Sequence, residues 1–590
     1  MTDVAATRQL HSTHLGTGLL VAGLAGAASL QPSISHRSVT QQAIITAASV
    51  GLGFLVGSLG GKAADGLSSS VPGGASGAYA AMAGSGAGLM LAATRIGAAG
   101  SAPGMRGAAH TLGFALAVSG AAGLGLGATH ALDTALKPHL GAIGTNAVGA
   151  NAVSITAGAA AVVGAGLLFH QPATFVGEAS RVTAAAQKAF ANAPADLLSA
   201  AKGGPGAAIV AAPELLPTVS GGANSTLKFA DLGTHGKEFV TEAISGADIR
   251  RIMGEGVDPK RAYAPLKSAA TMNGRVDLLM KEVEQQGFFD GTLNRIVIAT
   301  GTGSGFIDPP SIQAAEIAER GKMGTMALQY SEEPSVITQL KGHTHLGAEE
   351  TAEVLKRVNA RIAAMPAHLK KPEVSMFGES LGALAQHQSF GEESAADLLK
   401  HHVASSLWVG VPFESKFEAR AISQLGRAGN PGDLQAFDRI ESYEKLPAES
   451  RAGIRHLVLA HDNDPVHVLD KKRIWFQRPD YLNANRALRP AGIPTNERYI
   501  PGVSGLQGIV DLLNGTHPTP GKFEAYSHDY RADLPEFVRA WLKADVPGSS
   551  NYVNSDQVQG ITQELVNREL LRTGLSNQAK AAAAQLKAAA

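Results

Sequence analysis

Hydrophobic and polar residues are distributed unevenly along this chain of 590 residues. Residues 1–170 are rich in Gly, Ala, Leu and Val and hold few charges, whereas charged side chains are common from about Arg181 onward. The two parts therefore call for separate interpretation, because an apolar segment and an alternating segment predict different structures.

The apolar part contains several windows that approach the roughly 20 residues a helix needs to cross a bilayer. These windows are 15–30, 42–61, 77–93, 107–132 and 148–169. Glycine is tolerated in lipid, where small residues let helices approach closely, and Gly53, Gly57 and Gly61 recur along one helix face. We predict a transmembrane domain of about four or five spans over residues 1–175. A soluble Gly/Ala segment is the alternative, and a signal peptide explains only the first window.

Positive charges between the windows give a slight preference for one orientation. With five spans, one side of the membrane carries the larger set and the other side the smaller. The larger set is Arg37, Arg95, Arg106, Arg181 and Lys188, and the smaller is Arg8, Lys62 and Lys137. We therefore expect a multi-pass plasma-membrane protein with its C-terminal part in the cytoplasm, an inference that reverses if one window does not span.

From residue 227 onward, short apolar runs alternate with helical patterns. We expect strands at 294–300, 324–330, 372–377, 406–413 and 454–460, and a helix at 349–365. Continuous apolar strands separated by helices predict an α/β fold with a mainly parallel sheet covered on both faces. We expect a linker with an amphipathic helix at 176–226, the catalytic domain at 227–548, and a helical or disordered tail at 549–590.

The segment Gly378–Glu379–Ser380–Leu381–Gly382 places a serine between two glycines. In a chain with 69 Gly and 41 Ser, chance alone gives about half an occurrence of this pattern, so the pattern has little weight by itself. Its context has more weight, because the serine follows a predicted strand and precedes a helix-forming stretch. A serine at a sharp strand-to-helix turn is the nucleophile elbow of α/β-hydrolases.

A serine nucleophile needs a base and an acid, which follow it along the chain in this arrangement. Asp462 and Asp464 both follow the strand at 454–460, and their spacing alone does not choose between them. The greater distance from the strand and the stiffness of Pro465 favour Asp464. His528, in a loop-like segment near the end of the chain, is the expected base. The competing histidines are His461, His467 and His517.

The oxyanion of such a reaction needs two backbone donors. One is expected from Leu381, and the other from the glycine-dense loop Gly301, Thr302 and Gly303. A phosphate loop is the rival interpretation, but no Gly-Lys-Ser/Thr follows. No histidine or carboxylate cluster has a metal-ligand spacing, so we expect neither a metal nor a cofactor.

Several segments, in order, resemble an α/β-hydrolase family frequent in actinobacteria, whose N-terminal half is a multi-span membrane region. They are "LQPSISHRSVTQQAIITAASVGLGFLVG", "DIRRIMG", "GFFDGTLNRIVIATGTGSGFIDP", "ALQYSEEPS", "FGESLGA", "LWVGVPF", "NDPV", "RPDYL" and "SHDY". The resemblance implies a triad of Ser380, Asp464 and His528. The chain departs from the family in its tryptophan-poor spans and in Ser527, which replaces a glycine before the histidine.

These patterns predict a membrane-anchored serine hydrolase that cleaves acyl esters or thioesters. An acyltransferase with the same triad is one alternative, and a membrane scaffold or transporter with an inactive hydrolase-like domain is another. The expected partners are a lipid membrane and a small-molecule or lipid acyl ester. Lys plus Arg equals Asp plus Glu at 50 each, which gives no indication of nucleic-acid binding, and the absence of Cys excludes disulfides.

Overall fold

The computed structural model describes residues 13–96 (without 36 and 38), 116, 119, 214–390, 398, 400–415 and 433–589 (without 472, 484, 516 and 517). Its described residues form two compact units. The first contains the N-terminal residues together with Leu469–Asn514, and the second contains the remainder, up to Val468 and from Gly515. The sequence predicts one continuous catalytic domain at 227–548, which includes the segment 469–514. The structure instead groups this segment with the N-terminal residues.

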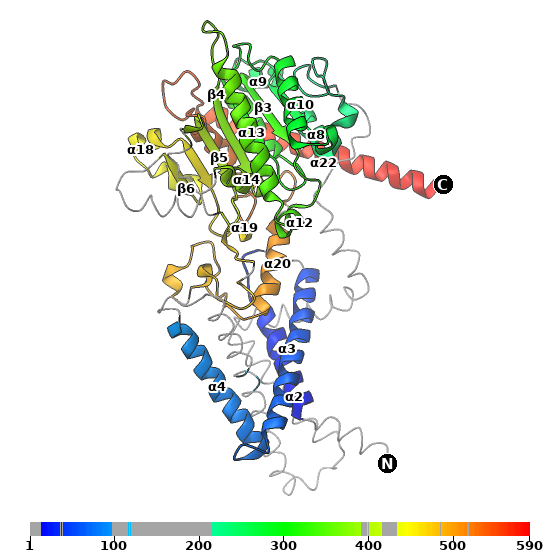
Figure 1. Ribbon diagram of the computed structural model, residues 1–590, viewed down its shortest axis with the longest axis vertical. Coiled ribbons are helices and arrows are strands. Elements are labelled where there is room, and N and C mark those ends of the chain that lie inside the picture. Colours follow the sequence, from blue (N-terminus) through cyan, green and yellow to red (C-terminus); the bar gives the residue numbers. More distant parts are fainter. Residues whose placement is uncertain are drawn as a thin grey trace. The chain divides into compact units, whose positions relative to one another are not determined.

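The second unit is built around a sheet of seven strands, all paired in parallel, in the order β1-β3-β2-β4-β5-β7-β6 (Figure 1). The strands are β1 (Lys260–Ala264), β2 (Arg295–Thr300), β3 (Met323–Leu328), β4 (Glu373–Glu379), β5 (Ser405–Val409), β6 (Leu434–Phe437) and β7 (His456–Leu459). The predicted parallel sheet is confirmed, and each of the five predicted strands corresponds to one of these.

Helices connect and cover the strands of this sheet. They are α8 (Gly233–Thr241), α9 (Gly246–Met253), α10 (Met272–Gln285), α11 (Pro309–Ala318), α12 (Ser335–Leu340), α13 (Thr344–Ala363), α14 (Leu381–Ser389), α17 (Ile440–Glu444), α18 (Ala448–Gly453), α19 (Pro465–Val468), α21 (Leu534–Trp541) and α22 (Ser555–Ala589), with short 3₁₀ turns η2 (Phe229–Leu232) and η3 (Leu266–Ser268). The expected C-terminal tail is thus largely one helix.

Alternate residues of each strand enter separate cores on the two faces of the sheet, as the period of a strand requires. Phe377 of β4 lies in the core formed with α8, α9, α11, α21 and α22. The preceding residue, Met376, lies in the core formed with α10 and α13. Both faces are therefore buried, which explains why the central strands are continuously apolar.

The first unit begins with α2 (Thr13–Ser29), α3 (Val39–Leu67) and α4 (Gly74–Ile96), which cover the first three apolar windows. Two of the glycines predicted to share a helix face lie where α3 crosses α2. A Cβ atom at Gly53 would lie 2.6 Å from the carbonyl oxygen of Val21, and one at Gly57 would lie 2.5 Å from that of Thr17. The missing side chains thus allow the close approach of the two backbones.

Within the described residues, a single helix, Gln41–Leu67, is long and apolar enough to cross a membrane, and the apolar stretch Thr17–Ser29 is shorter. The expectation of four or five spans is therefore not supported in this part of the chain. The window at 77–93 consists mostly of Gly and Ala, which favour lipid far less than Leu, Ile, Phe or Val. The windows at 107–132 and 148–169, and Arg181 and Lys188, lie outside the described residues.

The segment 469–514 contributes η4 (Asp480–Leu482), η5 (Arg486–Leu488) and most of α20 (Val503–Gly515). The buried carboxylate of Asp511 accepts hydrogen bonds from Ser33 Oγ (2.7 Å) and from the Ser35 amide (3.3 Å). Burial raises the pKa of Asp511 to about 6, although Arg37 and these hydrogen bonds oppose the rise. The polar residues before α3 therefore hold this segment in the first unit.

Candidate active site

Ser380 occupies the sharp turn between β4 and α14. Its backbone has φ 51° and ψ −122°, and its amide donates a hydrogen bond of 2.8 Å to the carbonyl oxygen of Val409 at the end of β5. A positive φ is strained for a residue with a side chain, and such strain persists only where the surrounding structure enforces it. The predicted strand–serine–helix arrangement is thus present in the structure.

The glycines on either side of Ser380 are required by sterics. A Cβ atom at Gly378 would lie 2.7 Å from the amide nitrogen of Ala383, and one at Gly382 would collide with the carbonyl oxygen of Thr300. The second contact brings the start of α14 against the end of β2. The loop that begins at Gly301 therefore lies beside the serine turn.

The predicted oxyanion loop is folded on itself. The Thr302 amide donates to the carbonyl oxygen of Phe306 (2.8 Å), and the Gly305 amide donates to that of Thr302 (2.9 Å). Tyr263 also stabilises the loop, because its hydroxyl donates to the Gly305 carbonyl (3.0 Å). The Thr302 amide is already occupied in this conformation. The amides of Leu381, Gly301 and Gly303 are the remaining donors among those predicted.

Asp464 lies directly after β7 and is fully buried. Its Oδ2 atom accepts hydrogen bonds of 2.6 Å from His528 Nδ1 and from the Tyr530 hydroxyl, and its Oδ1 accepts one of 2.8 Å from the Val466 amide. Burial opposes the negative charge, but His528 and the hydrogen bonds outweigh it and hold the pKa of Asp464 below its usual range. Asp464 is therefore a carboxylate prepared to bind an imidazole.

The end of β5 connects this pair to the serine turn. The ring of His528 packs on Gly410, where an added Cβ atom would lie 2.5 Å from Cε1. Gly410 directly follows Val409, whose carbonyl oxygen binds the amide of Ser380. His528 and Ser380 thus contact consecutive residues, and the missing side chain of Gly410 leaves room for the imidazole.

The competing residues have other environments. Asp462 is half-buried and lies 3.6 Å from a guanidinium nitrogen of Arg439. His467 forms a 2.9 Å hydrogen bond with the carbonyl oxygen of Val411, and His461 pairs with Asp533. His517 lies outside the described residues. Among the described candidates, the structure brings Asp464 and His528 together and leaves Asp462 outside that pair.

Two residues near the serine turn were not predicted from sequence. Burial, together with the negative charges of Asp308, Asp529 and Asp464, raises the pKa of Glu379 well above its usual range. Among the described residues, the buried Glu379 Oε2 atom has no hydrogen-bond partner, which disfavours a charge on this carboxyl group. The sequence signal was only its place inside the serine motif. Tyr530, the donor to Asp464, follows the predicted base by two residues and had no signal of its own.

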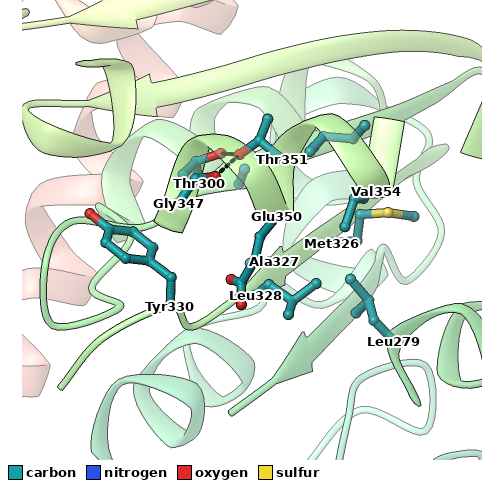
Figure 2. A pocket seen from close by; sticks show the side chains of 12 residues that line it. Leu279, Thr300, Met326, Ala327, Leu328, Tyr330, Gly347, Glu350, Thr351 and Val354 are labelled. Atoms are coloured by element: carbon teal, nitrogen blue, oxygen red, sulfur yellow. Dashed lines mark hydrogen bonds between the residues drawn. The ribbon is translucent and has the colours of Figure 1, made fainter. Parts of the chain in front are cut away.

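A small cavity of about 10 Å³ lies between β2, β3 and α13 (Figure 2). Glu350 and Tyr330 line it, and Glu350 also forms an ion pair with Arg275. Thr300 and Thr351, joined by a 2.8 Å hydrogen bond, lie on its wall. Since this volume is about that of one water molecule, the cavity is too small for an acyl substrate.

Comparison of the chain with known protein families finds a match that includes this site. A model described as an alpha/beta-hydrolase family covers residues 260–557. This range contains every strand of the sheet and the residues Ser380, Asp464 and His528. No curated protein and no solved structure shows a significant match to the chain.

Proposed function

The chain belongs to the alpha/beta-hydrolase family, and from this premise we propose that it is a membrane-anchored serine hydrolase that cleaves acyl esters or thioesters. The observation that carries the proposal is the buried 2.6 Å bond between Asp464 and His528. The histidine ring packs on the strand end to which the amide of Ser380 is bonded. An acid–base pair beside the serine turn supports the proposal that an acid, a base and a nucleophile act together here.

In the proposed reaction, Ser380 Oγ attacks the carbonyl carbon of the substrate. Because the Nδ1–H of His528 is committed to Asp464, its Nε2 atom is the one that takes the serine proton. The same proton then goes to the leaving alcohol or thiol, and an acyl group remains on Ser380. Water, deprotonated by His528, releases the acid and restores the serine. Asp464 holds the ring in the required tautomer and stabilises its cation.

The charge that develops on the carbonyl oxygen needs donors beside Ser380. The Leu381 amide, at the start of α14, is the first proposed donor, because the first amides of a helix have no partner within it. Gly301 or Gly303 is proposed to supply the second. The raised pKa of Glu379 supports this arrangement, because it disfavours a further negative charge next to the serine, which would oppose formation of the oxyanion.

Membrane anchoring is proposed from α3. Leu55 and Leu59, four residues apart on this helix, are each 56% exposed. Exposed leucines along an apolar segment are favourable in lipid and unfavourable in water. A hydrolase held at a membrane encounters acyl lipids first, so we propose lipid-like esters as substrates.

The test is labelling of the full chain in membranes with a fluorophosphonate probe, followed by hydrolysis of a short p-nitrophenyl ester. We expect Ser380→Ala to abolish labelling and to reduce turnover to a weak residual level. Ser442→Ala in α17, which removes a hydroxyl bonded to Asp438, is the matched control and should label normally. Undiminished labelling of Ser380→Ala would exclude Ser380 as the nucleophile. Analysis of products in the presence of an alcohol separates hydrolysis from acyl transfer.

A further inference from the structure

A second acid–histidine pair lies beside the first, with the acid and the histidine exchanged between the two chain segments. Asp464 on the segment after β7 binds His528 on the segment before α21. His461, on the first of these segments, binds Asp533 on the second, with Nε2 2.9 Å from Oδ2. All of these side chains are buried. The same two segments are therefore joined twice, with acid and histidine exchanged.

The second pair also holds the peptide next to the proposed base. His461 Nδ1 lies 2.9 Å from the carbonyl oxygen of Ser527, so both ring nitrogens of His461 face oxygen atoms. A carbonyl oxygen only accepts hydrogen bonds, so Nδ1 donates to Ser527 and Nε2 is the atom that pairs with Asp533. Ser527 has a strained φ of 58°, and its amide donates to Asn463 Oδ1 (3.0 Å). The amide and the carbonyl of Ser527, the residue before His528, are thus both bonded to the segment after β7 that carries Asp464.

Tyr530 connects the two pairs. Its ring stacks on the ring of His461, with centroids 4.1 Å apart and an interplanar angle of 23°. Its hydroxyl donates to Asp464 Oδ2 (2.6 Å) and accepts from the His461 amide (3.1 Å). Burial raises the pKa of Tyr530 well above its usual range, so the hydroxyl remains a donor. Asp464 Oδ2 is therefore shared between the base and a tyrosine.

We propose that Tyr530 and the His461–Asp533 pair form a positioning assembly for the catalytic base. The assembly orients His528 and limits how strongly Asp464 attracts the Nδ1 proton of His528. This inference rests on the proposed serine hydrolase function. These residues act through Asp464 and His528 and do not contact the substrate. The sharing of Oδ2 disperses the carboxylate charge, so the proton taken from Ser380 can be passed on to the leaving group.

The pH dependence of the reaction reports on this role. The charged and titratable groups that face the Asp464–His528 pair come from the base loop, α19, the end of β4 and the start of α11. His467, Tyr530 and Glu379 interact with Asp464, whereas Asp308, Asp529 and Arg531 act on Glu379. His461 stacks on Tyr530 and pairs with Asp533. Tyr530→Phe changes one neutral donor in this set and none of the charges. Loss of the donor makes Asp464 more basic, so we expect the pH dependence of the reaction to move to higher pH.

The experiment compares the full-length Tyr530→Phe and wild-type proteins over a pH series with one ester substrate. We expect the acidic limb of kcat/KM to move to higher pH by roughly half to one unit. We expect kcat to fall about tenfold, as for loss of a hydrogen bond to a charged group, with KM changed less than about twofold. Tyr443→Phe is the matched control, because this equally buried tyrosine donates to Asp545 Oδ2 (2.8 Å). It should change thermal stability alone.

Asp533→Asn supplies a second arm, since it keeps the shape of the side chain and weakens its hold on His461. We expect a lower kcat with an unchanged KM, and an effect that is not additive with Tyr530→Phe. If Tyr530→Phe does not fold, the profile of Asp533→Asn decides, and an unchanged kcat there overturns the proposal. An unshifted acidic limb in folded Tyr530→Phe also overturns it. Failure of the wild-type protein to label with the fluorophosphonate probe would instead reject the serine hydrolase function itself.

Discussion

Asp462 and Asp464 are chemically identical and two positions apart, but their surroundings differ completely. Asp464 is fully buried and accepts three hydrogen bonds, one each from His528, Tyr530 and the Val466 amide. Asp462 is half-buried and has Arg439 as an ion-pair partner. A buried carboxylate without such donors would be costly, so the donors identify which aspartate serves the histidine.

The exchange of each aspartate for asparagine tests this assignment. We expect Asp464→Asn to lower kcat by roughly 10³- to 10⁴-fold, because an amide can hold His528 in the wrong tautomer and cannot stabilise its cation. Asp462→Asn is the matched control and should lower kcat by less than about tenfold. Turnover of one ester by both variants settles the matter. A severe loss in Asp462→Asn alone would reverse the roles, and mild losses in both would place the acid elsewhere.

Sequence reasoning selected Ser380 and Asp464 from their positions after predicted strands, and His528 from its place in the order of the chain, all of which are local patterns. It did not reach Tyr530, Asp533 or Glu379. Their roles depend on which side chains meet after folding, and a tyrosine two residues after a histidine has no distinguishing pattern. Those residues are recognisable only from contacts between segments more than 60 positions apart.

At the scale of elements, the serine turn depends on the contact between α14 and β2. Gly382→Ala would place a methyl group against the Thr300 carbonyl, and a backbone atom cannot rotate away. We expect a loss of about 1–3 kcal/mol in unfolding free energy, and a drop in turnover of more than about tenfold, because the helix must move relative to the oxyanion loop.

Gly453→Ala is the control for this substitution. Gly453 is the last residue of α18, and nothing lies within 4 Å of the position its Cβ would take. Its stability and turnover should match those of the wild-type protein. Thermal unfolding and ester hydrolysis, measured on both variants, give the answer. Wild-type turnover in Gly382→Ala would show that the elbow tolerates a shift of α14 and that its geometry does not limit the reaction.

The strands that sequence predicted are those with uniformly apolar patterns. The strands β2, β3, β4, β5 and β7 are apolar and buried on both faces, which gives a clear signal. β1 was missed because it begins with Lys260 and Arg261, and Arg261 is buried only through its ion pair with Glu316. β6 was missed because Gln435 interrupts its apolar residues, and its two middle positions are only partly buried.

At the scale of the whole molecule, one division of the chain was not apparent from sequence. The segment 469–514 lies between Asp464 and His528 along the chain but belongs to the first unit. The contacts that hold it there include the hydrogen bonds of Gln31 with Arg498 and of Ser33 with Asp511, and a small apolar cluster of Ala28, Ile500 and Val503. They join residues more than 460 positions apart. Hydrophobic periodicity does not report such contacts, so sequence reasoning placed the segment in the catalytic domain.

The proposed membrane anchor, helix α3, can be tested by membrane fractionation. In the wild-type protein, α3 should keep the full chain in the membrane pellet after alkaline carbonate treatment, and only detergent should release it. Leu55 lies near the middle of the segment Gln41–Leu67 and is 56% exposed. An arginine there costs about 2.5–3.5 kcal/mol at the centre of a lipid-embedded helix. We therefore expect Leu55→Arg to release a large fraction of the chain, as measured by immunoblots of pellet and supernatant.

Leu571→Arg, at a leucine of α22 that is 66% exposed, is the matched control and should remain in the pellet. Recovery of the wild-type chain in the high-speed supernatant without detergent would reject the anchor. Equal retention of Leu55→Arg and wild type would mean that this face of α3 does not meet lipid.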